Sequence, residues 1–340
     1  MLRIGAALSL TGRFARFGTQ AAAGLQAWRD LDGGAGIEIV DDGSSPASVT
    51  SALDALAGRC DVLLGPYGTS TARAAARWAR DHDRLVWNHG GAGGDLQVPG
   101  RVVPVITPTE RYGEAFVRHV AEHRPGSELR LVGGPGTFGP QVIDGMRRTA
   151  ASLGVPLSDT GDVLFTAGTF EHDTGLIAGL QRSAPGATAD AGPDAGRRCS
   201  AGPGHRRYPA VVGAVAAGVR AFAEAVPDPE GAYGVAQWMA GAGDPVVVGP
   251  EEDAFVARYR DITGSDPDYP AVQAAAAAAI AVHCTDLAGT TDPDALWSAA
   301  TGLRTTTLYG AFGIDPTTGA QTDHTLTLVR WQDGRLLPVR

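Results

Sequence analysis

Short apolar runs alternate with stretches of helical periodicity along most of the chain. The run 3–8 predicts a buried strand, and 19–31 predicts a helix because Ala, Leu and Trp28 recur at helical spacing. Further strands are expected at 36–41, 61–64 and 85–87, and further helices at 47–57 and 71–82. Strands that alternate with helices predict a parallel sheet covered by helices on both faces.

A second series of the same kind follows a glycine-rich loop at 88–94. Its helices are expected at 114–123, 141–153 and 174–181, and its strands at 129–132 and 162–165. Later elements are expected at 210–215, at 271–287 (an alanine-rich helix) and at 310–314 and 326–331 (two strands). Two such series in 340 residues predict an α/β protein of two domains. Ligands of parallel sheets bind beyond the carboxyl ends of the strands, where the Gly-, Ser- and Thr-rich loops of this chain fall.

The segment 183–209 interrupts the second series. From Ser183 to Arg207 it contains no Val, Ile, Leu or aromatic residue, so it cannot form a buried strand. Its abundance of Gly, Pro, Ala and Arg is typical of an irregular or disordered loop.

Net charge and cysteine spacing exclude several classes of partner. The net charge of −9 disfavours nucleic acid and anionic membranes as the main partner. No apolar run is expected to span a membrane, so we expect no direct membrane insertion. The three cysteines, Cys60, Cys199 and Cys284, have the spacing of neither a metal site nor a disulfide framework.

The N-terminus leads directly into the first expected strand. No charged leader, long apolar segment or cleavage site precedes that strand. As written, the chain therefore carries no export signal and is expected in the cytoplasm. A true start upstream, with a signal peptide, is the alternative that the sequence leaves open.

Three short patterns resemble parts of enzyme sites. The segment 134–139, Gly-Pro-Gly-Thr-Phe-Gly, matches the dinucleotide-binding fingerprint, with Asp159 near the expected distance. The segment 119–123 matches the zinc-binding pattern H-x-x-E-H, and 68–72 resembles a nucleophile elbow with Ala in place of the last Gly.

None of the three patterns is accompanied by the other residues that its chemistry requires. Pro135 stiffens the glycine loop, no third zinc ligand stands out, and no recognisable triad surrounds Ser70. The simpler interpretations are a tight turn, a solvated helix face and a strand-end loop whose hydroxyls and amides meet a ligand. We therefore expect no catalysis, no cofactor and no metal.

The order of segments resembles type I periplasmic solute-binding proteins of the leucine/isoleucine/valine-binding family, the substrate-binding proteins of branched-chain amino acid ABC transporters. The resemblance covers nearly the whole chain except 183–209, and it rests on the ordered series rather than on one motif. The residues that carry it are Ile-Gly-Ala-Ala-Leu-Ser-Leu-Thr-Gly at 4–12, Phe17, Gly18, Gly24, Leu-Leu-Gly-Pro-Tyr-Gly-Thr-Ser-Thr at 63–71, the loop to Gly94, 129–154 with Phe138, Gly139 and Gly145, Trp238, Phe255, Tyr259, Gly264, Pro267, Gly310 and Trp331.

This resemblance implies a clamshell of two Rossmann-like lobes joined by a multi-strand hinge of three crossovers. Lobe 1 is expected at 1–107 plus 237–313 and lobe 2 at 108–236 plus 314–340. The family binds a small polar or aromatic solute in the interlobe cleft and delivers it to an ABC permease, if the protein is exported. The alternative is a cytoplasmic ligand sensor or regulator of the amide-sensor kind with the same fold.

The resemblance also implies a ligand site. Its residues are Phe17, Tyr67, Gly68, Thr69, Gly90, Gly91, Ala92, Phe138 and Val215. Phe17 falls at the mouth of the cleft, and Thr69 falls on the hydroxyl that binds a ligand carboxylate. The loop 90–92 falls on the backbone that completes the carboxylate site.

Three positions depart from the family pattern. Ala92 lacks the usual hydroxyl, Phe138 stands where a tyrosine often packs on the ligand, and Val215 stands near the acidic residue that pairs with an ammonium group. Burying an ammonium group without a counter-charge costs several kcal/mol of binding free energy. We therefore expect an uncharged or aromatic solute rather than a zwitterion. The alternative is that 183–209 shifts the alignment and the true partner of the ammonium lies elsewhere.

In the family, 183–209 carries a buried strand and a helix of the second lobe. A tract of altered reading frame between two compensating shifts would explain its composition here, and so would a genuine long loop. With either explanation, the sheet of the second lobe is expected to lack one ordered strand.

Overall fold

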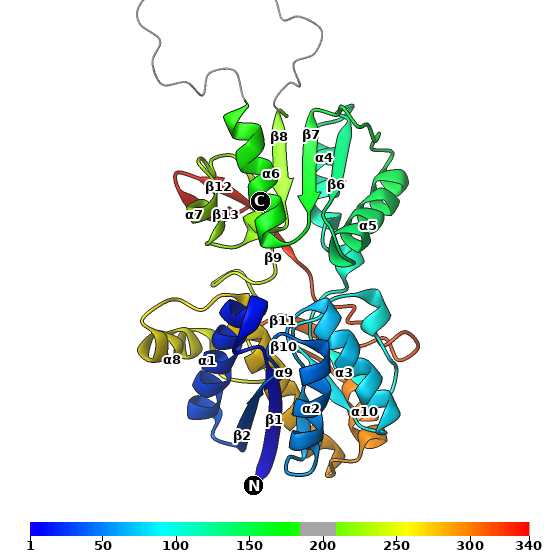
Figure 1. Cartoon of the computed structure of the whole chain (residues 1–340), viewed down its shortest axis with the longest axis vertical. Helices are drawn as coiled ribbons and strands as arrows, with labels where there is room; N and C mark the ends of the chain where they lie inside the picture. The colour runs from blue at the N-terminus through cyan, green and yellow to red at the C-terminus, as the bar shows by residue number, and fades with distance from the viewer. Residues whose placement is uncertain (184–208, 340) are drawn as a thin grey trace, which may run out of the picture. The chain divides into compact units, whose positions relative to one another are not determined.

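The computed structural model describes residues 1–183 and 209–339 (Figure 1). The chain forms two compact units. Unit 1 comprises Met1–Thr109 and Gln237–Leu326, and unit 2 comprises Glu110–Ala236 and Thr327–Arg340. The chain therefore passes from one unit to the other three times, after residues 109, 236 and 326.

Unit 1 is built on a parallel sheet of five strands. From one edge to the other they are β2 (Ala35–Asp41), β1 (Leu2–Leu8), β3 (Val62–Leu64), β4 (Val86–Asn88) and β5 (Val102–Pro104). All four neighbouring pairs are parallel, so the carboxyl ends of these strands share one edge of the sheet. The loops that follow the strands meet at this edge.

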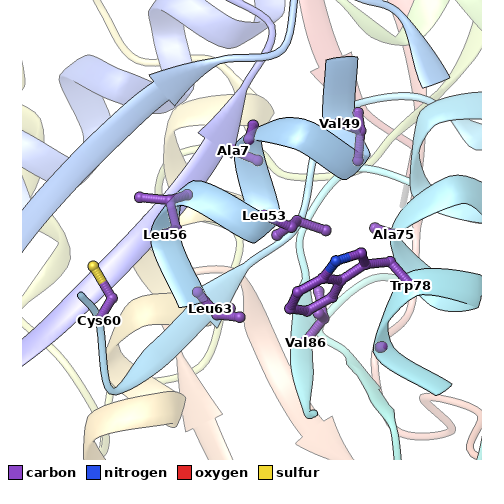
Figure 2. Close-up of a cluster of buried hydrophobic side chains, with 11 residues drawn as sticks. Ala7, Val49, Leu53, Leu56, Cys60, Leu63, Ala75, Trp78 and Val86 are labelled. Carbon is purple, nitrogen blue, oxygen red and sulfur yellow. The ribbon is translucent and has the colours of Figure 1, made fainter. Parts of the chain in front are cut away.

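Helices cover both faces of this sheet. On one face α2 (Pro46–Ala57) and α3 (Thr69–Asp81) pack together, and Figure 2 shows Leu53, Leu63 and Trp78 in the cluster that they bury against the strands. The indole N–H of Trp78 donates to Asp54, 2.6 Å away, so the buried aromatic ring keeps a polar partner. On the other face α1 (Ala15–Asp32) packs against α9 (Tyr269–Ala288).

Helix α9 is predominantly apolar because it is a core helix of unit 1. It contacts α1, α10 (Pro293–Gly302), β3 and β4, and all residues from Tyr269 to Ala281 are buried. By length and composition α9 passes for a membrane span, although 67% of its most apolar window is buried. The expectation that no run approaches that length was therefore wrong, and the helix's place inside unit 1 explains its composition.

The described part of unit 2 contains a mixed sheet of six strands. Across the sheet they are β13 (Arg335–Pro338), β12 (Thr327–Gln332), β9 (Tyr233–Ala236), β8 (Val211–Ala214), β7 (Val163–Ala167) and β6 (Leu129–Gly133). The four strands β6 to β9 are parallel, whereas β12 is antiparallel to both β9 and β13. The carboxyl ends of β6, β7 and β8 therefore lie at one edge.

The described residues of unit 2 form four α-helices. They are α4 (Glu114–His123), α5 (Phe138–Leu153), α6 (Phe170–Arg182) and α7 (Phe222–Ala225). Helix α4 packs against α5, and the ring of Phe116 on α4 lies 4.9 Å from that of Phe165 on β7. A separate buried cluster joins Ile177 of α6 to Phe222 and Trp331.

The remaining described elements are short or peripheral. They are η1 (Gly12–Phe14), η2 (Gly94–Leu96), η3 (Thr109–Arg111), η4 (Ala216–Gly218), α8 (Glu252–Thr263), β10 (Arg304–Thr307) and β11 (Gly310–Gly313). Helices α7, α8 and α10 and strands β5, β9, β10 and β13 were not predicted from the sequence. The residues 184–208 lie outside the described part of the chain, and so does most of the expected irregular segment 183–209.

The segment 314–326 lies in unit 1, whereas the sequence expectation assigned it to the second lobe. Ile314 bridges to Gln321, and Gln321 donates to the carbonyl of Ala311, 3.1 Å away. The ring of His324 stacks on Tyr309 at 4.0 Å, and its Nδ1 lies 2.5 Å from Thr107 Oγ1. These contacts hold the segment against β11 and against Thr107, which lies near the end of the first segment of unit 1, Met1–Thr109.

Candidate functional site

The loop after β3 turns directly into helix α3 at the carboxyl edge of the unit 1 sheet. Gly68 caps the helix with a positive φ of 92°, and a Cβ at this position would lie 2.7 Å from the ring of Phe14. Only glycine therefore fits here. The first backbone N–H groups of α3 and the positive end of its dipole lie at this edge, an arrangement that favours an anionic group.

Three consecutive hydroxyls stand at the start of α3. Thr71 donates to the carbonyl of Gly68, 2.8 Å away, and Ser70 Oγ accepts from the guanidinium of Arg13, 2.9 Å away. Thr69 Oγ1 makes no hydrogen bond within the described part of the chain, and the residue is partly exposed. Thr69 is therefore the hydroxyl that remains available to a solute. The partner of Ser70 is an arginine and not a general base.

The loop after β4 is braced by a buried asparagine. Asn88 Oδ1 accepts from the N–H groups of Gly90 and Gly91 at 3.2 and 3.0 Å, and its Nδ2 donates to the carbonyl of Gly91 at 2.6 Å. The two glycine N–H groups are thus already paired. The carbonyl of Gly90 accepts from Gly68, 2.9 Å away, so the β3 and β4 loops are held together. A Cβ at Gly90 would lie 2.6 Å from the Cα of Tyr67.

Four aromatic side chains gather beside these loops, and we call Phe14, Phe17, Tyr67 and Tyr269 the aromatic cluster. Phe17 stacks on Tyr67 with 4.4 Å between ring centres and an angle of 10°, and Phe14 meets Tyr67 edge-on at 5.6 Å. The hydroxyls of Tyr67 and Tyr269 are hydrogen-bonded to each other. Burial raises the pKa of the Tyr67 hydroxyl above its ordinary value, so the hydroxyl stays protonated.

A buried amide network lies one helical turn beyond Tyr269. Gln273 Nε2 donates to Gln237 Oε1 and to the hydroxyl of Tyr309, both 2.9 Å away. Gln273 Oε1 is buried and has no hydrogen-bond partner among the described residues. Such an acceptor is expected to take a hydrogen bond from water or from a ligand.

Unit 2 presents a second edge of strand ends. Phe138 is the first residue of α5 and meets Tyr112 edge-on at 5.5 Å. Val215 follows β8, and its N–H donates to the carbonyl of Thr166, 3.2 Å away. Next to Val215, the N–H of Ala216 faces the buried carboxylate of Asp173 at 3.4 Å. Burial raises the pKa of Asp173, and hydrogen bonds from its neighbours oppose this effect.

The two remaining enzyme-like patterns have structural explanations. In 134–139, a Cβ at Gly139 would overlap the carbonyl oxygen of Ala167, and Gly136 has a φ of 90°. In 119–123, the two imidazoles stack at 4.4 Å, and His119 Nε2 lies 3.3 Å from the hydroxyl of Tyr233. No group of three metal-ligating side chains occurs among residues 1–183 and 209–339.

The structure brings some of the predicted site residues together within each unit. Phe17, Tyr67, Gly68, Thr69 and the loop 90–92 share the strand-end edge of unit 1, and Phe138 and Val215 lie at the strand ends of unit 2. Sequence reasoning missed Phe14, Tyr269, Gln273 and Asp173. The signal for Tyr269 and Gln273 was a pair of polar residues four apart in the otherwise apolar first part of α9, residues 269–282.

Comparison with known proteins matches nearly the whole chain to one family model. Residues 1–335 match a family model described as periplasmic binding protein. No curated protein sequence matches the chain. Among solved structures, the leucine-binding protein LivK of Thermotoga maritima has 14% identity and a TM-score of 0.79, covering 100% of this chain and 98% of its own.

Two further structures share the fold at similar identity. LivJ of Streptococcus pneumoniae, solved with isoleucine, has 12% identity and a TM-score of 0.75, with 99% of this chain and 97% of that chain covered. A solute-binding protein of R. palustris, solved with 4-hydroxybenzoate, has 16% identity and a TM-score of 0.76, with 99% and 95% covered. These likenesses confirm the expected fold, that of two-lobed type I periplasmic binding proteins.

Proposed function

Because this chain belongs to the periplasmic binding protein family, we propose that it captures a small organic solute for an ABC importer. The solute contacts the loops at the carboxyl ends of the parallel strands. The nine residues expected from the sequence remain the candidate contacts, and Phe14 and Tyr269 join them as members of the aromatic cluster.

The observation that carries this proposal is the aromatic cluster beside the start of α3. Stacked rings such as Phe17 and Tyr67 offer a flat apolar surface to a solute. The available hydroxyl of Thr69 and the N-terminus of α3 offer hydrogen-bond donors and a positive field to a carboxylate. A small acid with an apolar body satisfies both features.

Two solute classes fit this description. LivJ was solved with isoleucine, and two proteins of the same fold were solved with 4-hydroxybenzoate and 3,4-dihydroxybenzoic acid. Isoleucine has an ammonium group that the benzoates lack. Because Ala92 and Val215 lack the polar groups of the family pattern, we favour the aromatic acids for this chain.

A thermal-shift screen of the full chain tests the proposal. The panel contains isoleucine, leucine, benzoate, 4-hydroxybenzoate, benzamide and urea. At a free concentration of about 100 times its Kd, a true solute raises the free energy of unfolding by about 2.7 kcal/mol. The absence of a shift with every member of the panel contradicts the proposed function.

A further inference from the structure

The chain crosses between the two units after residues 109, 236 and 326, and a polar residue of unit 1 lies beside each crossing. Thr107 lies two residues before the first crossing, Gln237 directly follows the second, and His324 lies two residues before the third. A buried tyrosine, Tyr309, connects these three positions. Together with Gln273 of α9 they form a hydrogen-bonded group that we call the crossing network: Thr107, Gln237, Gln273, Tyr309 and His324.

Tyr309 lies at a buried hairpin turn. Strands β10 and β11 are antiparallel with Thr307 opposite Gly310, so Leu308 and Tyr309 form the turn between them. Turns usually lie at the surface, but here both turn residues are buried, with 4% and 3% of their area exposed. Gly310 has a φ of 120°, and a Cβ there would lie 3.2 Å from the ring of His324. The hairpin therefore places Tyr309 inside unit 1, against His324.

The ring and the main-chain carbonyl of Tyr309 reach the first and third crossings. The ring stacks on His324 with 4.0 Å between ring centres, and the carbonyl accepts from His324 Nε2, 3.0 Å away. A carbonyl oxygen only accepts, so Nε2 carries a hydrogen, and Nδ1 lies 2.5 Å from Thr107 Oγ1. The same hydroxyl of Thr107 lies 3.2 Å from the main-chain carbonyl of His324. The segments before these two crossings are thus joined to each other and to Tyr309.

The hydroxyl of Tyr309 reaches the second crossing. It accepts from Gln273 Nε2 at 2.9 Å and donates to Gln237 Oε1 at 3.3 Å. Gln273 Nε2 also donates to Gln237 Oε1 at 2.9 Å, so the three side chains close a ring of hydrogen bonds. Tyr309 and Gln273 are buried, and a buried polar group that loses its partner destabilises the protein. The hydroxyl of Tyr309 therefore joins the second crossing and α9 to the other two crossings.

Helix α9 connects the crossing network to the aromatic cluster. Gln273 lies one helical turn after Tyr269, whose hydroxyl is hydrogen-bonded to that of Tyr67. Tyr67 in turn stacks on Phe17. Burial raises the pKa of the Tyr309 hydroxyl, and the nearby Tyr67 adds to this effect, so the hydroxyl stays protonated and can donate. Every residue of this path belongs to unit 1.

We propose that Tyr309 is a positioning residue that couples solute binding at the aromatic cluster to the segments beside the chain crossings. A solute that packs on Tyr67 restricts the Tyr67–Tyr269 pair and the start of α9, and the crossing network extends this restriction to the crossings. Tyr309 itself does not touch the solute. This inference rests on the proposed function, because it assigns a conformational response to the same binding event.

Hydrogen exchange with mass spectrometry on the full chain tests the inference. The probe is the solute of the thermal-shift panel (isoleucine, leucine, benzoate, 4-hydroxybenzoate, benzamide or urea) that gives the largest shift. In the wild type, it should slow exchange beside all three crossings, at 104–109, 236–240 and 321–326. In Tyr309→Phe the slowing should persist at 236–240, which keeps its bond to Gln273, and be lost at the other two. Solute affinity should fall by about 2- to 10-fold, because one neutral hydrogen bond carries the coupling.

Thr107→Val should give a different pattern. It removes a hydroxyl beside the first crossing alone, so the slowing should be lost at 104–109 and kept at 236–240 and 321–326. The matched control is Tyr259→Phe, which changes a buried tyrosine of α8 outside the crossing network and should respond like the wild type. A purely structural role of Tyr309 would instead change exchange at all three crossings alike, with and without solute.

The outcomes separate this inference from the proposed function. If the wild type binds a solute without slowing at the crossings, or if either Tyr309→Phe or Thr107→Val keeps the wild-type pattern or loses the slowing at all three, the inference is wrong and solute binding stands. Circular dichroism should show that both variants are folded, and Thr107→Val decides alone if Tyr309→Phe is not. If the wild type binds no member of the panel, the proposed function fails and the inference fails with it.

Discussion

At the scale of single residues, the three hydroxyls at the start of α3 differ in what they are free to bind. Ser70 and Thr71 are engaged within unit 1, whereas Thr69 has no partner within the described part of the chain. Thr69→Ala should therefore weaken solute binding by about 0.5–3 kcal/mol, with the upper end for a charged solute group. Calorimetry should show full affinity for the control variant Ser70→Ala, and an equal loss in both variants would contradict the assignment.

His89, next to the braced loop, is a buried titratable group without a hydrogen-bond partner among the described residues. Burial lowers its pKa from 6.5 to about 4. The unfolded chain binds a proton near pH 6.5 and the folded chain does not until about pH 4. Stability contributed by the neutral ring is therefore present above pH 6.5 and is lost as the pH falls toward 4, by up to about 1.4 kcal/mol per pH unit.

Replacing His89 should remove its contribution to the pH dependence of the free energy of unfolding. Denaturant unfolding of His89→Gln between pH 4 and pH 6.5 should show a shallower loss of stability than the wild type. Equal slopes for wild type and His89→Gln would refute the assignment to His89.

At the scale of elements, the packing of α1 on α9 depends on the absence of a side chain. A Cβ at Gly24 in α1 would overlap the backbone of Ala271 in α9. Alanine favours an isolated helix over glycine by about 1 kcal/mol, but overpacking a close contact costs about 1–3 kcal/mol. We expect Gly24→Ala to lower the free energy of unfolding.

Gly175 in α6 is the matched control for this substitution. A Cβ at Gly175 meets nothing within 4 Å, so Gly175→Ala should raise the free energy of unfolding by about 0.5–1 kcal/mol. Urea unfolding should show a lower free energy of unfolding for Gly24→Ala than for the wild type and a higher one for Gly175→Ala. Stabilisation by Gly24→Ala would show that α1 and α9 are less closely packed than the structure indicates.

At the scale of the whole molecule, each unit supplies a set of parallel strands whose carboxyl ends carry polar and aromatic side chains. The chain belongs to the periplasmic binding protein family, so binding is its expected activity. We expect the solute to bind and dissociate chemically unchanged. Chromatography of benzoate or isoleucine after prolonged incubation with the protein should recover the starting compound, and protein-dependent conversion would contradict a pure binding function.

Periodicity and local chemistry were enough to predict the α/β class and most of the secondary structure. The helix expected at 114–123 is found as Glu114–His123, because its apolar positions recur at helical spacing. Strand β9 was missed, since a four-residue buried run has no period that separates strand from helix. Helix α8 was missed because its apolar stripe is narrow and its surface is largely exposed.

The sequence by itself also indicated the strand-end loops and Thr69, because glycines and hydroxyls between apolar runs are local signals. Only the tertiary structure decided which distant side chains meet, as with Tyr67 and Tyr269, or Thr107 and His324. It also showed that the N–H groups of Gly90 and Gly91 are already paired with Asn88. The physical reason is that the spacing of nearby apolar residues shows which face of a strand or helix is buried. Contacts between side chains far apart in the chain depend instead on strand order and helix packing.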